Sequence, residues 1–377
     1  MTTLTIYFCG TGSSKFDSSN PNYWNGELVS TLANNNLGRE FAEWVVIDGP
    51  GSGNLQDDEL WVKSGEHYDW TGNLFGMGWK ENIQHAMQIM KGNVDWQREK
   101  LTEEQYNQLK KAGIPIQDVE VTGSFFWRHY DYGTKKVTQQ QLQQQIIKMF
   151  RKDGIIPTRV NLVGWSRGGV SCHMLANAML ADPALKNIPV NIFAIDPVPG
   201  PLNFQNDKVT LGPNVKEYVA FYAQDERSKG FSCVIPIMDK STVAHIYPMR
   251  GRHGTLVGNA SADGSGSGKV LFEPGMIVRH FAEVCLTRWG VNQDKKLAQN
   301  DGQLVQLHEA VKKNAALYTK MQSNSYTVVT ENDKGERYVS LGSKGTNFSS
   351  IKGGQYSPAA GLTADYLGDR SIYNVIK

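Results

Sequence analysis

The sequence predicts an α/β protein with a mostly parallel sheet and flanking helices. Strand-length apolar runs alternate with helical patterns from residue 1 to about residue 290, and this alternation is typical of βαβ units. From about Val291 onward the composition becomes polar. A chain of 377 residues is long enough for one large or two ordinary domains. We therefore expect residues 1–290 to form the main domain and residues 291–377 an α+β lobe at the C-terminus.

Six apolar runs are strand candidates. They are residues 4–8, 44–47, 160–163, 190–195, 216–222 and 243–247. Their spacing suits the crossover connections that parallel strands need. Ligands of open parallel sheets bind beyond the carboxyl ends of the strands, so the loops after these runs are where functional residues are expected.

Helices are predicted where apolar residues recur every three or four positions, as they do over residues 79–90 and 139–151. The polar stretch from about residue 92 to 133 interrupts the pattern, and we expect it to be an insertion ahead of the strand at 160–163. Its Phe125-Phe126-Trp127 either line a substrate cleft or pack in an ordinary strand. In the C-terminal lobe the spacing predicts one long helix over residues 304–318. A β-hairpin over 326–341 is expected to turn at residues 332–335.

Charge and composition narrow the function classes. Lys and Arg total 39 against 37 Asp and Glu, a balance that does not suggest a nucleic-acid partner. No apolar run approaches the roughly 18 residues that span a bilayer, so membrane contact is expected to be peripheral. The N-terminal residues show no signal-peptide pattern, which predicts a cytoplasmic location in the producing cell. The four cysteines lack metal-type spacing and are expected to be reduced, buried thiols, with no metal and no cofactor.

The most informative motif is Gly164-Trp165-Ser166-Arg167-Gly168, which lies between the strand candidate 160–163 and a helical stretch. Strand, sharp turn and helix around G-x-S-x-G are typical of a nucleophile elbow, in which a strained turn exposes the serine hydroxyl. Glycine is needed on both sides because neighbouring backbone comes close to the serine. Ser166 is therefore the candidate nucleophile.

A serine hydroxyl needs an imidazole to take its proton and a carboxylate to orient that imidazole. His253 is the best candidate base, because it follows the strand candidate 243–247 in a glycine-containing loop. His280 is the fallback. The other six histidines precede Ser166 or lie inside predicted helices and strands.

Two aspartates are candidates for the carboxylate. Asp196 ends the strand candidate 190–195, and Asp225 follows the strand candidate 216–222. Each also has an ordinary structural interpretation, a loop cap beside Pro197 for Asp196 and an exposed ion pair with Arg227 for Asp225. The residues alone leave this choice open.

Two backbone N–H groups are expected to bind the oxyanion. One belongs to Arg167, directly after the nucleophile, and the other comes from the glycine-rich loop after the first strand, where Gly10 and Thr11 are the candidates. The Gly-x-Gly of this loop is also found in dinucleotide sites, but the third glycine and the ribose-binding acid are missing.

Together these segments resemble the α/β-hydrolase family of bacterial type VI secretion phospholipase effectors, over roughly residues 4–290. Cys9 departs from the family aspartate, and Gly254 and Thr255 replace its Ser-Asp. The matching segments are residues 10–12, 48–53, 75–79 with Asn82, 164–169, 196–200, 225–227 and 251–258. The resemblance implies an α/β-hydrolase-like sheet, with Asp196 as the triad acid and Asp225 behind it.

We therefore expect a serine ester hydrolase of the lipase or phospholipase type that acts on lipid esters. A small-molecule carboxylesterase, thioesterase or acyltransferase is the alternative within enzymes. A hydrolase-fold binding or toxin module without catalysis is the alternative outside them. The resemblance further implies delivery into target cells by a specialised secretion system, with the secretion machinery or an immunity protein as partner.

Overall fold

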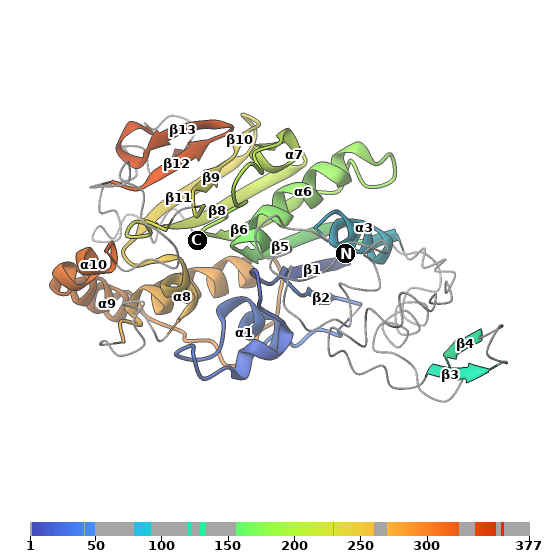
Figure 1. The fold of residues 1–377 in the computed structure, drawn as a ribbon, viewed down its shortest axis with the longest axis horizontal. Coiled ribbons are helices and arrows are strands. Elements are labelled where there is room, and N and C mark those ends of the chain that lie inside the picture. Colours follow the sequence, from blue (N-terminus) through green and yellow to red (C-terminus); the bar gives the residue numbers. More distant parts are fainter. Residues whose placement is uncertain are drawn as a thin grey trace.

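A parallel sheet forms the centre of the molecule (Figure 1). Its strand order is β14-β11-β8-β6-β5-β1-β2, and each neighbouring pair in it is parallel. The strands are β1 (Thr3–Phe8), β2 (Trp44–Ile47), β5 (Arg159–Trp165), β6 (Val190–Ile195), β8 (Val215–Ala223), β11 (Val243–Met249) and β14 (Tyr356–Ser357). The first six coincide with the six predicted strands, and the predicted α/β class is confirmed.

The computed structural model describes residues 2–40, 42–49, 79–91, 119–122, 129–132, 156–228, 230–259, 270–323, 336–351 and 356–357. Within the expected insertion, β3 (Val119–Thr122) and β4 (His129–Tyr132) pair as antiparallel strands. The aromatic run 125–127 and the helix expected over 139–151 lie outside the described residues.

Helices cover both faces of the sheet. One face packs against α3 (Trp79–Lys91) and α6 (Arg167–Ala181), and the other against α1 (Leu28–Asn34) and α8 (Glu273–Arg288) (Figure 1). Alternate side chains of β1 divide between these layers, because successive residues of a strand point to opposite faces. Leu4, Ile6 and Phe8 join the first apolar cluster, whereas Tyr7 joins the second. Both faces of the central strands are therefore buried, which explains their continuous apolar sequences.

The chain winds outward from β1 in both directions. It continues from β1 to β2 at one edge, and then returns to place β5, β6, β8 and β11 successively on the other side. The point between β1 and β5, where the direction reverses, is where open parallel sheets form their ligand crevice. The carboxyl ends of these two strands therefore mark the expected place of a site.

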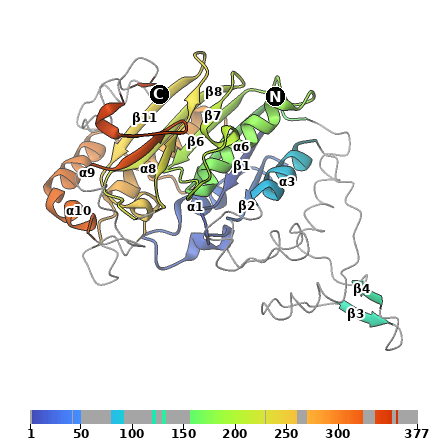
Figure 2. The ribbon, with the colours of Figure 1, turned by 45° about the horizontal axis from the view of Figure 1, so that its top comes forward.

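The segment expected as a C-terminal lobe begins with two helices that lie outside α8 (Figure 2). They are α9 (Asp301–Lys313) and α10 (Ala315–Met321). The prediction of one long helix over 304–318 was wrong, because the helix ends at Asn314, which caps both pieces with φ −93° and ψ 14°. Asparagine favours helix ends because its amide competes with the backbone for hydrogen bonds.

A hairpin lies further along the chain than the one predicted over 326–341. β12 (Tyr338–Leu341) and β13 (Lys344–Asn347) pair around Gly342, which has a φ of 60°, a value that suits glycine. Residues 332–335, where the turn was expected, lie outside the described part of the chain.

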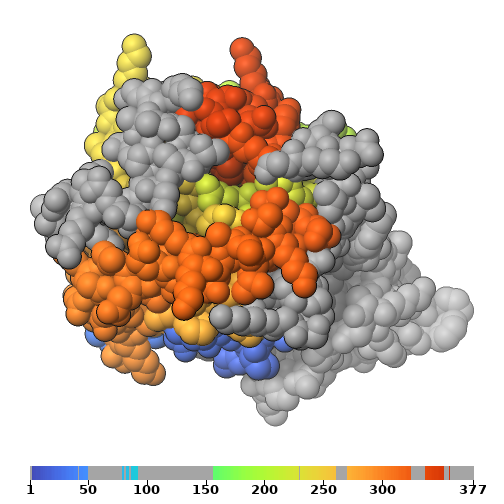
Figure 3. Space-filling model, turned by 90° about the vertical axis from the view of Figure 1, so that its left-hand side faces the viewer, coloured from blue at the N-terminus to red at the C-terminus, as the bar shows by residue number. Residues whose placement is uncertain are grey.

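The C-terminal segment makes two strand pairings with the rest of the protein. β12 pairs in parallel with β9 (Cys233–Ile235), and β14 extends the central sheet beside β11. Figure 3 shows the hairpin in red and the C-terminal helices in orange, with atoms from the middle of the chain visible between them. A domain boundary at residue 290 remains a prediction, and it has to accommodate both pairings.

The remaining elements are short. They are η1 (Lys15–Ser19), α7 (Asn206–Val209), β7 (Thr210–Leu211), β10 (Ile237–Met238), η3 (His253–Val257) and η5 (Phe348–Ser350). In the part of the chain that the structure describes, no helix has both the length and the apolar character required to cross a membrane. All four cysteines are buried and unpaired.

Candidate active site

The predicted site residues follow five neighbouring strands of the central sheet. Gly10 and Thr11 come after β1, Ser166 after β5, Asp196 after β6, Asp225 after β8 and His253 after β11. Since the strands are parallel, these positions all lie at the carboxyl edge of the sheet.

Ser166 forms the whole connection between β5 and α6. Its backbone has φ 59° and ψ −127°, a conformation that non-glycine residues rarely adopt. Hydrogen bonds fix it on both sides: the Ser166 N–H donates to the carbonyl of Ile195 (3.0 Å), and its own carbonyl accepts from the N–H of Val198 (3.2 Å). Such strain persists only where the surroundings enforce it, and it is common at functional sites.

The two glycines of the motif are needed because backbone segments meet there. A Cβ on Gly164 would lie 2.3 Å from the carbonyl oxygen of Gly168, and a Cβ on Gly168 would lie 2.2 Å from the carbonyl oxygen of Phe8. Neither backbone oxygen can move aside as a flexible side chain would. The G-x-S-x-G spacing thus allows α6 to start directly against the ends of β5 and β1.

His253 is the first residue of η3 and is almost fully buried. Its Nδ1 lies 2.6 Å from Oδ2 of Asp196, and its backbone N–H donates to Oε2 of Glu226 (3.2 Å). The imidazole also contacts two aromatic rings, those of Trp165 at 5.0 Å and Phe231 at 5.2 Å between ring centroids. The ring is therefore held by a carboxylate at one nitrogen and by aromatic groups around it.

Asp196 is fully buried and has a positive φ of 41°. Besides the contact with His253, its Oδ1 accepts hydrogen bonds from the N–H of Ala223 (3.0 Å) and from Nη1 of Arg337 (2.5 Å). Burial alone would raise the pKa of this carboxyl. The positive charge of Arg337 and the hydrogen bond from His253 outweigh burial, and the pKa of Asp196 is lowered from its ordinary value.

Asp225, the alternative acid, has other partners. Its Oδ2 accepts from Nε of Arg250 and from the N–H of Gly251, both at 2.8 Å. Its Oδ1 accepts from Nη2 of Arg250 (2.9 Å) and from Nε2 of Gln322 (2.8 Å). The carboxylate thus joins the loop ahead of His253 to the end of α10. The ion pair expected with Arg227 is replaced by a two-pronged pair with Arg250.

The loop after β1 packs directly on the elbow. A Cβ on Gly10 would lie 2.3 Å from the Trp165 ring, so only glycine brings this backbone so close to the motif. Nη1 of Arg167 donates to Oγ1 of Thr11 (3.0 Å) and connects the two predicted oxyanion segments through their side chains. Burial lowers the pKa of Arg167 to about 10.

Two histidines other than His253, namely His173 and His280, lie inside helices of the described chain. His173 lies inside α6, where Nδ1 contacts the carbonyl of Lys208 (2.8 Å) and Nε2 the hydroxyl of Tyr218 (3.0 Å). Burial lowers its pKa to about 4. His280, the fallback base, lies within α8 beside Phe281, and burial likewise lowers its pKa to about 4.

Sequence reasoning did not identify Arg337, and it did not assign contacts to Glu226 or Phe231. Glu226 adjoins Asp225 in a segment that carries the family resemblance, and that segment was the only available signal for it. Arg337 is 141 residues from Asp196 in the chain. No local spacing connects the two, which come together where β12 pairs with β9.

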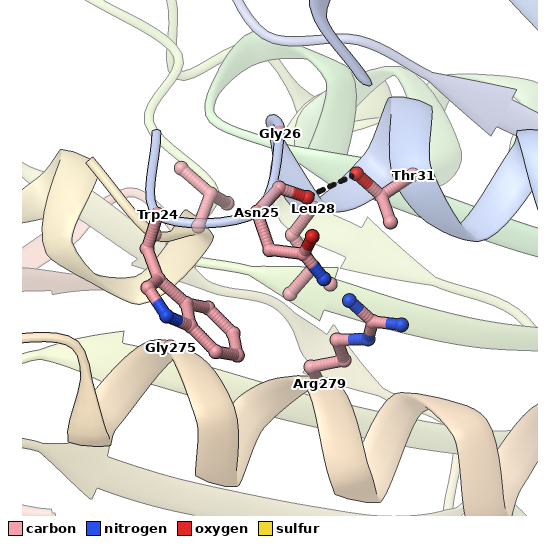
Figure 4. Close-up of a pocket in the computed structure, with 9 residues that line it drawn as sticks. Trp24, Asn25, Gly26, Leu28, Thr31, Gly275 and Arg279 are labelled. Carbon is pink, nitrogen blue, oxygen red and sulfur yellow. Dashed lines mark hydrogen bonds between the residues drawn. The ribbon is translucent and has the colours of Figure 1, made fainter. Parts of the chain in front are cut away.

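No cluster of three or more His, Cys, Asp or Glu side chains suited to a metal ion occurs among the described residues. A small pocket lies between residues 24–26 and α8, with Arg279 directed toward Asn25 and Thr31 (Figure 4). None of the predicted site residues lines this pocket.

Solved structures that are similar to this chain include the following two. One is an uncharacterized protein from Pseudomonas aeruginosa, with 17% identity and a TM-score of 0.45 over 78% of this chain and 46% of that one. The other is the Tle1 effector bound to the VgrG spike of the type VI secretion system, with 13% identity and a TM-score of 0.32 over 68% of this chain and 51% of that one. The chain therefore spans about half the length of each. No family model matches the chain, and no curated protein matches it.

Proposed function

We propose that the protein is a serine ester hydrolase that uses Ser166, His253 and Asp196. One observation carries the proposal: the 2.6 Å contact between His253 and the buried Asp196 lies at the same sheet edge as a serine in a strained turn. Backbone strain costs free energy, so a serine that served packing alone would not be expected in a strained turn between a strand and a helix.

The proposed reaction follows from the hydrogen bonds of the imidazole. A carboxylate can only accept, so Nδ1 of His253 carries a proton, and Nε2 is left with a lone pair to serve as the base. Nε2 takes the proton of the Ser166 hydroxyl while Oγ attacks the ester carbonyl. The imidazolium then returns the proton to the leaving alcohol, and a water molecule activated in the same way releases the acid and frees the serine.

The negative charge of the tetrahedral intermediate needs donors that are already in position. We assign this role to the backbone N–H of Arg167, the first residue of α6, and to the Gly10–Thr11 segment. The start of a helix favours an anion because its backbone N–H groups and its dipole point the same way.

Lipid esters, including phospholipids, are the proposed substrates. The motif resemblance supports this class, and the aromatic rings of Trp165 and Phe231 beside His253 provide apolar surroundings at the base. By the same resemblance, we propose that a type VI secretion system delivers the protein, with the secretion machinery or an immunity protein as partner. The Tle1 effector, whose structure is bound to the VgrG spike, provides a precedent for such a partner.

The test combines an active-site label with a substrate assay. A fluorophosphonate is expected to label the wild-type chain at Ser166, and the protein is expected to release fatty acid from mixed phospholipid liposomes. Ser166→Ala should abolish both. Labelling together with turnover of soluble esters alone would support a small-molecule esterase. Absence of both would support a binding module without catalysis.

Delivery can be tested separately in bacteria. Expression with an added export signal should inhibit growth more strongly than expression in the cytoplasm, because the acyl esters of the envelope then become accessible. Ser166→Ala should relieve the inhibition. Equal growth of the wild-type and Ser166→Ala strains in both compartments would count against an antibacterial lipase.

A further inference from the structure

Arg337 lies directly ahead of β12 and is almost fully buried. Its guanidinium makes three hydrogen bonds: Nη1 donates to Oδ1 of Asp196 (2.5 Å) and to the carbonyl of Ala223 (2.6 Å), and Nη2 donates to the carbonyl of Phe231 (2.6 Å). The partners belong to three different segments, which follow β6, end β8 and precede β9. One planar side chain from the C-terminal segment therefore connects the parts of the chain that surround Asp196.

The two oxygens of Asp196 are assigned to different partners. Oδ1 accepts from Arg337 and from the N–H of Ala223, whereas Oδ2 faces Nδ1 of His253. The Ala223 residue that donates its N–H to Oδ1 also accepts from Arg337 through its carbonyl. This small network fixes the rotation of the carboxylate, so that Oδ2 points at the imidazole.

Charge gives Arg337 a second effect. A buried carboxylate without a nearby cation is costly, and it tends to take up a proton instead. Arg337 is a cation in direct contact with Asp196, and the pairing also raises its own pKa although burial opposes this. With Arg337 present, uptake of one more proton by the Asp196–His253 pair gives this group of three a net positive charge. Without Arg337 the same uptake only neutralises a negative charge.

We propose that Arg337 is a positioning residue of the hydrolase site, which aims Asp196 at His253 and keeps the pair from taking up a further proton at mildly acidic pH. The inference rests on the proposed function of Ser166, His253 and Asp196. It makes the C-terminal segment part of the site, although that segment lies outside the motif resemblance.

Other ionisable groups near the pair belong to several elements. Glu226, in the loop after β8, accepts from the His253 N–H and lies 3.8 Å from Nε of Arg252. The opposite charges of Glu226 and Arg252 partly offset each other, and Arg337 is the cation in direct contact with Asp196. Burial raises the pKa of Cys233 on β9 to about 12 and also raises that of Tyr222 on β8, so both are neutral in this range.

The experiment compares Arg337→Gln and Arg337→Lys with the wild-type protein in the full chain. Arg250→Gln is the matched control, because Arg250 also pairs with a buried aspartate, Asp225, without contacting Asp196. The rate of fluorophosphonate labelling is measured from pH 5 to 9. Arg337→Gln should move the acidic limb of the profile upward by about one pH unit and slow labelling at pH 7 at least roughly tenfold.

Arg337→Lys keeps the charge but not the planar fork. Its acidic limb should stay at the wild-type pH while labelling slows, which separates the charge from the aiming of the carboxylate. Arg250→Gln should leave the limb in place. An unchanged limb in a folded Arg337→Gln protein, or a wild-type rate for Arg337→Lys, would overturn the inference.

A second readout does not depend on turnover. In a Ser166→Ala background with ¹³C-labelled histidine, the His253 ring signal is followed by NMR as a function of pH, with and without Arg337→Gln. The midpoint of its titration should move upward when Arg337 is replaced. If the wild-type protein neither reacts with the label nor cleaves esters, the proposed function fails. The NMR shift still decides what Arg337 does to the pair, and an unmoved midpoint rejects its role.

Discussion

Replacement of Asp196 by asparagine changes one oxygen into an NH2 group and leaves the side-chain volume almost unchanged. Oδ1 has two donors to accept from, the Ala223 N–H and Arg337, so the amide oxygen of an asparagine is expected to remain on that side. The NH2 group then faces Nδ1 of His253. Because NH2 can only donate, Nδ1 must become the acceptor and the ring proton must move to Nε2. His253 then has no lone pair with which to take the proton of Ser166.

The expected loss follows from that change of tautomer. Wrong-tautomer variants of Ser-His-Asp enzymes lose on the order of 10⁴ in rate, which corresponds to about 5 kcal/mol of transition-state stabilisation. Asp225→Asn is the matched comparison, because Asp225 is equally buried but bonds to Arg250, Gly251 and Gln322 instead. It should cost about 1–3 kcal/mol of folding stability and change the rate less than tenfold.

The assay is the turnover of a soluble activated ester by both variants at pH 8, together with their thermal unfolding curves. The ratio of the two losses is the decisive quantity, because both variants remove one buried negative charge at the same edge of the sheet. If Asp225→Asn lost more activity than Asp196→Asn at equal folded fraction, the assignment of the acid would be wrong. An Asp196→Asn protein with more than a tenth of the wild-type rate would be equally damaging.

Three further predictions concern stability. Gly168→Ala should destabilise the fold by about 3 kcal/mol, because the added Cβ meets the backbone oxygen of Phe8. Gly302→Ala in α9 is the control and should not destabilise the fold in this way. Urea unfolding compares the two variants, and equal midpoints would contradict the packing argument. Ser166→Gly should be about 1 kcal/mol more stable than Ser166→Ala, since glycine removes the strain at φ 59°, and calorimetry of the two inactive proteins tests this. Because the native state keeps His173 neutral down to about pH 4, the unfolded chain alone takes up its proton as the pH falls below about 6.5. The contribution of His173 to the free energy of unfolding is therefore fully present above about pH 6.5 and is lost as the pH falls. The wild-type protein should lose about 2 kcal/mol of stability between pH 7 and 5 from this source, and His173→Gln should remove that loss. An unchanged pH dependence of unfolding in His173→Gln would reject this cause.

Much of the framework was predictable because it depends on local sequence. The central strands are buried on both faces, so they appear as uninterrupted apolar runs such as residues 190–195. The turn at Ser166 was predictable because its two glycines lie where backbone segments meet. Gly164 contacts Gly168, and Gly168 contacts Phe8 at the end of β1, so neither position has room for a Cβ. The break at Asn314 was missed because helical periodicity continues across it, and only the backbone angles reveal the interruption.

The acid could not be chosen from strand ends alone, because Asp196 and Asp225 both follow parallel strands. Three-dimensional partners distinguish them: Arg250 and Gln322 occupy the oxygens of Asp225, and Asp196 keeps one oxygen for His253. Arg337 could not be predicted from the sequence for the same reason, because its contacts with the site are three-dimensional. Its bonds to Asp196, Ala223 and Phe231 form across a large separation in the sequence, with β12 held beside β9, and nothing in the residues around position 337 marks it.

The late position of Arg337 in the chain has a consequence for biosynthesis. A ribosome makes Ser166, Asp196 and His253 well before it makes β12, so in the nascent polypeptide Asp196 lacks the Arg337 counter-ion until the hairpin emerges and docks. A chain that ends before β12 therefore lacks the positive charge that balances Asp196 in the finished protein. A translation product that stalls between residues 260 and 330 should fold less stably at this edge and be degraded sooner than the finished protein.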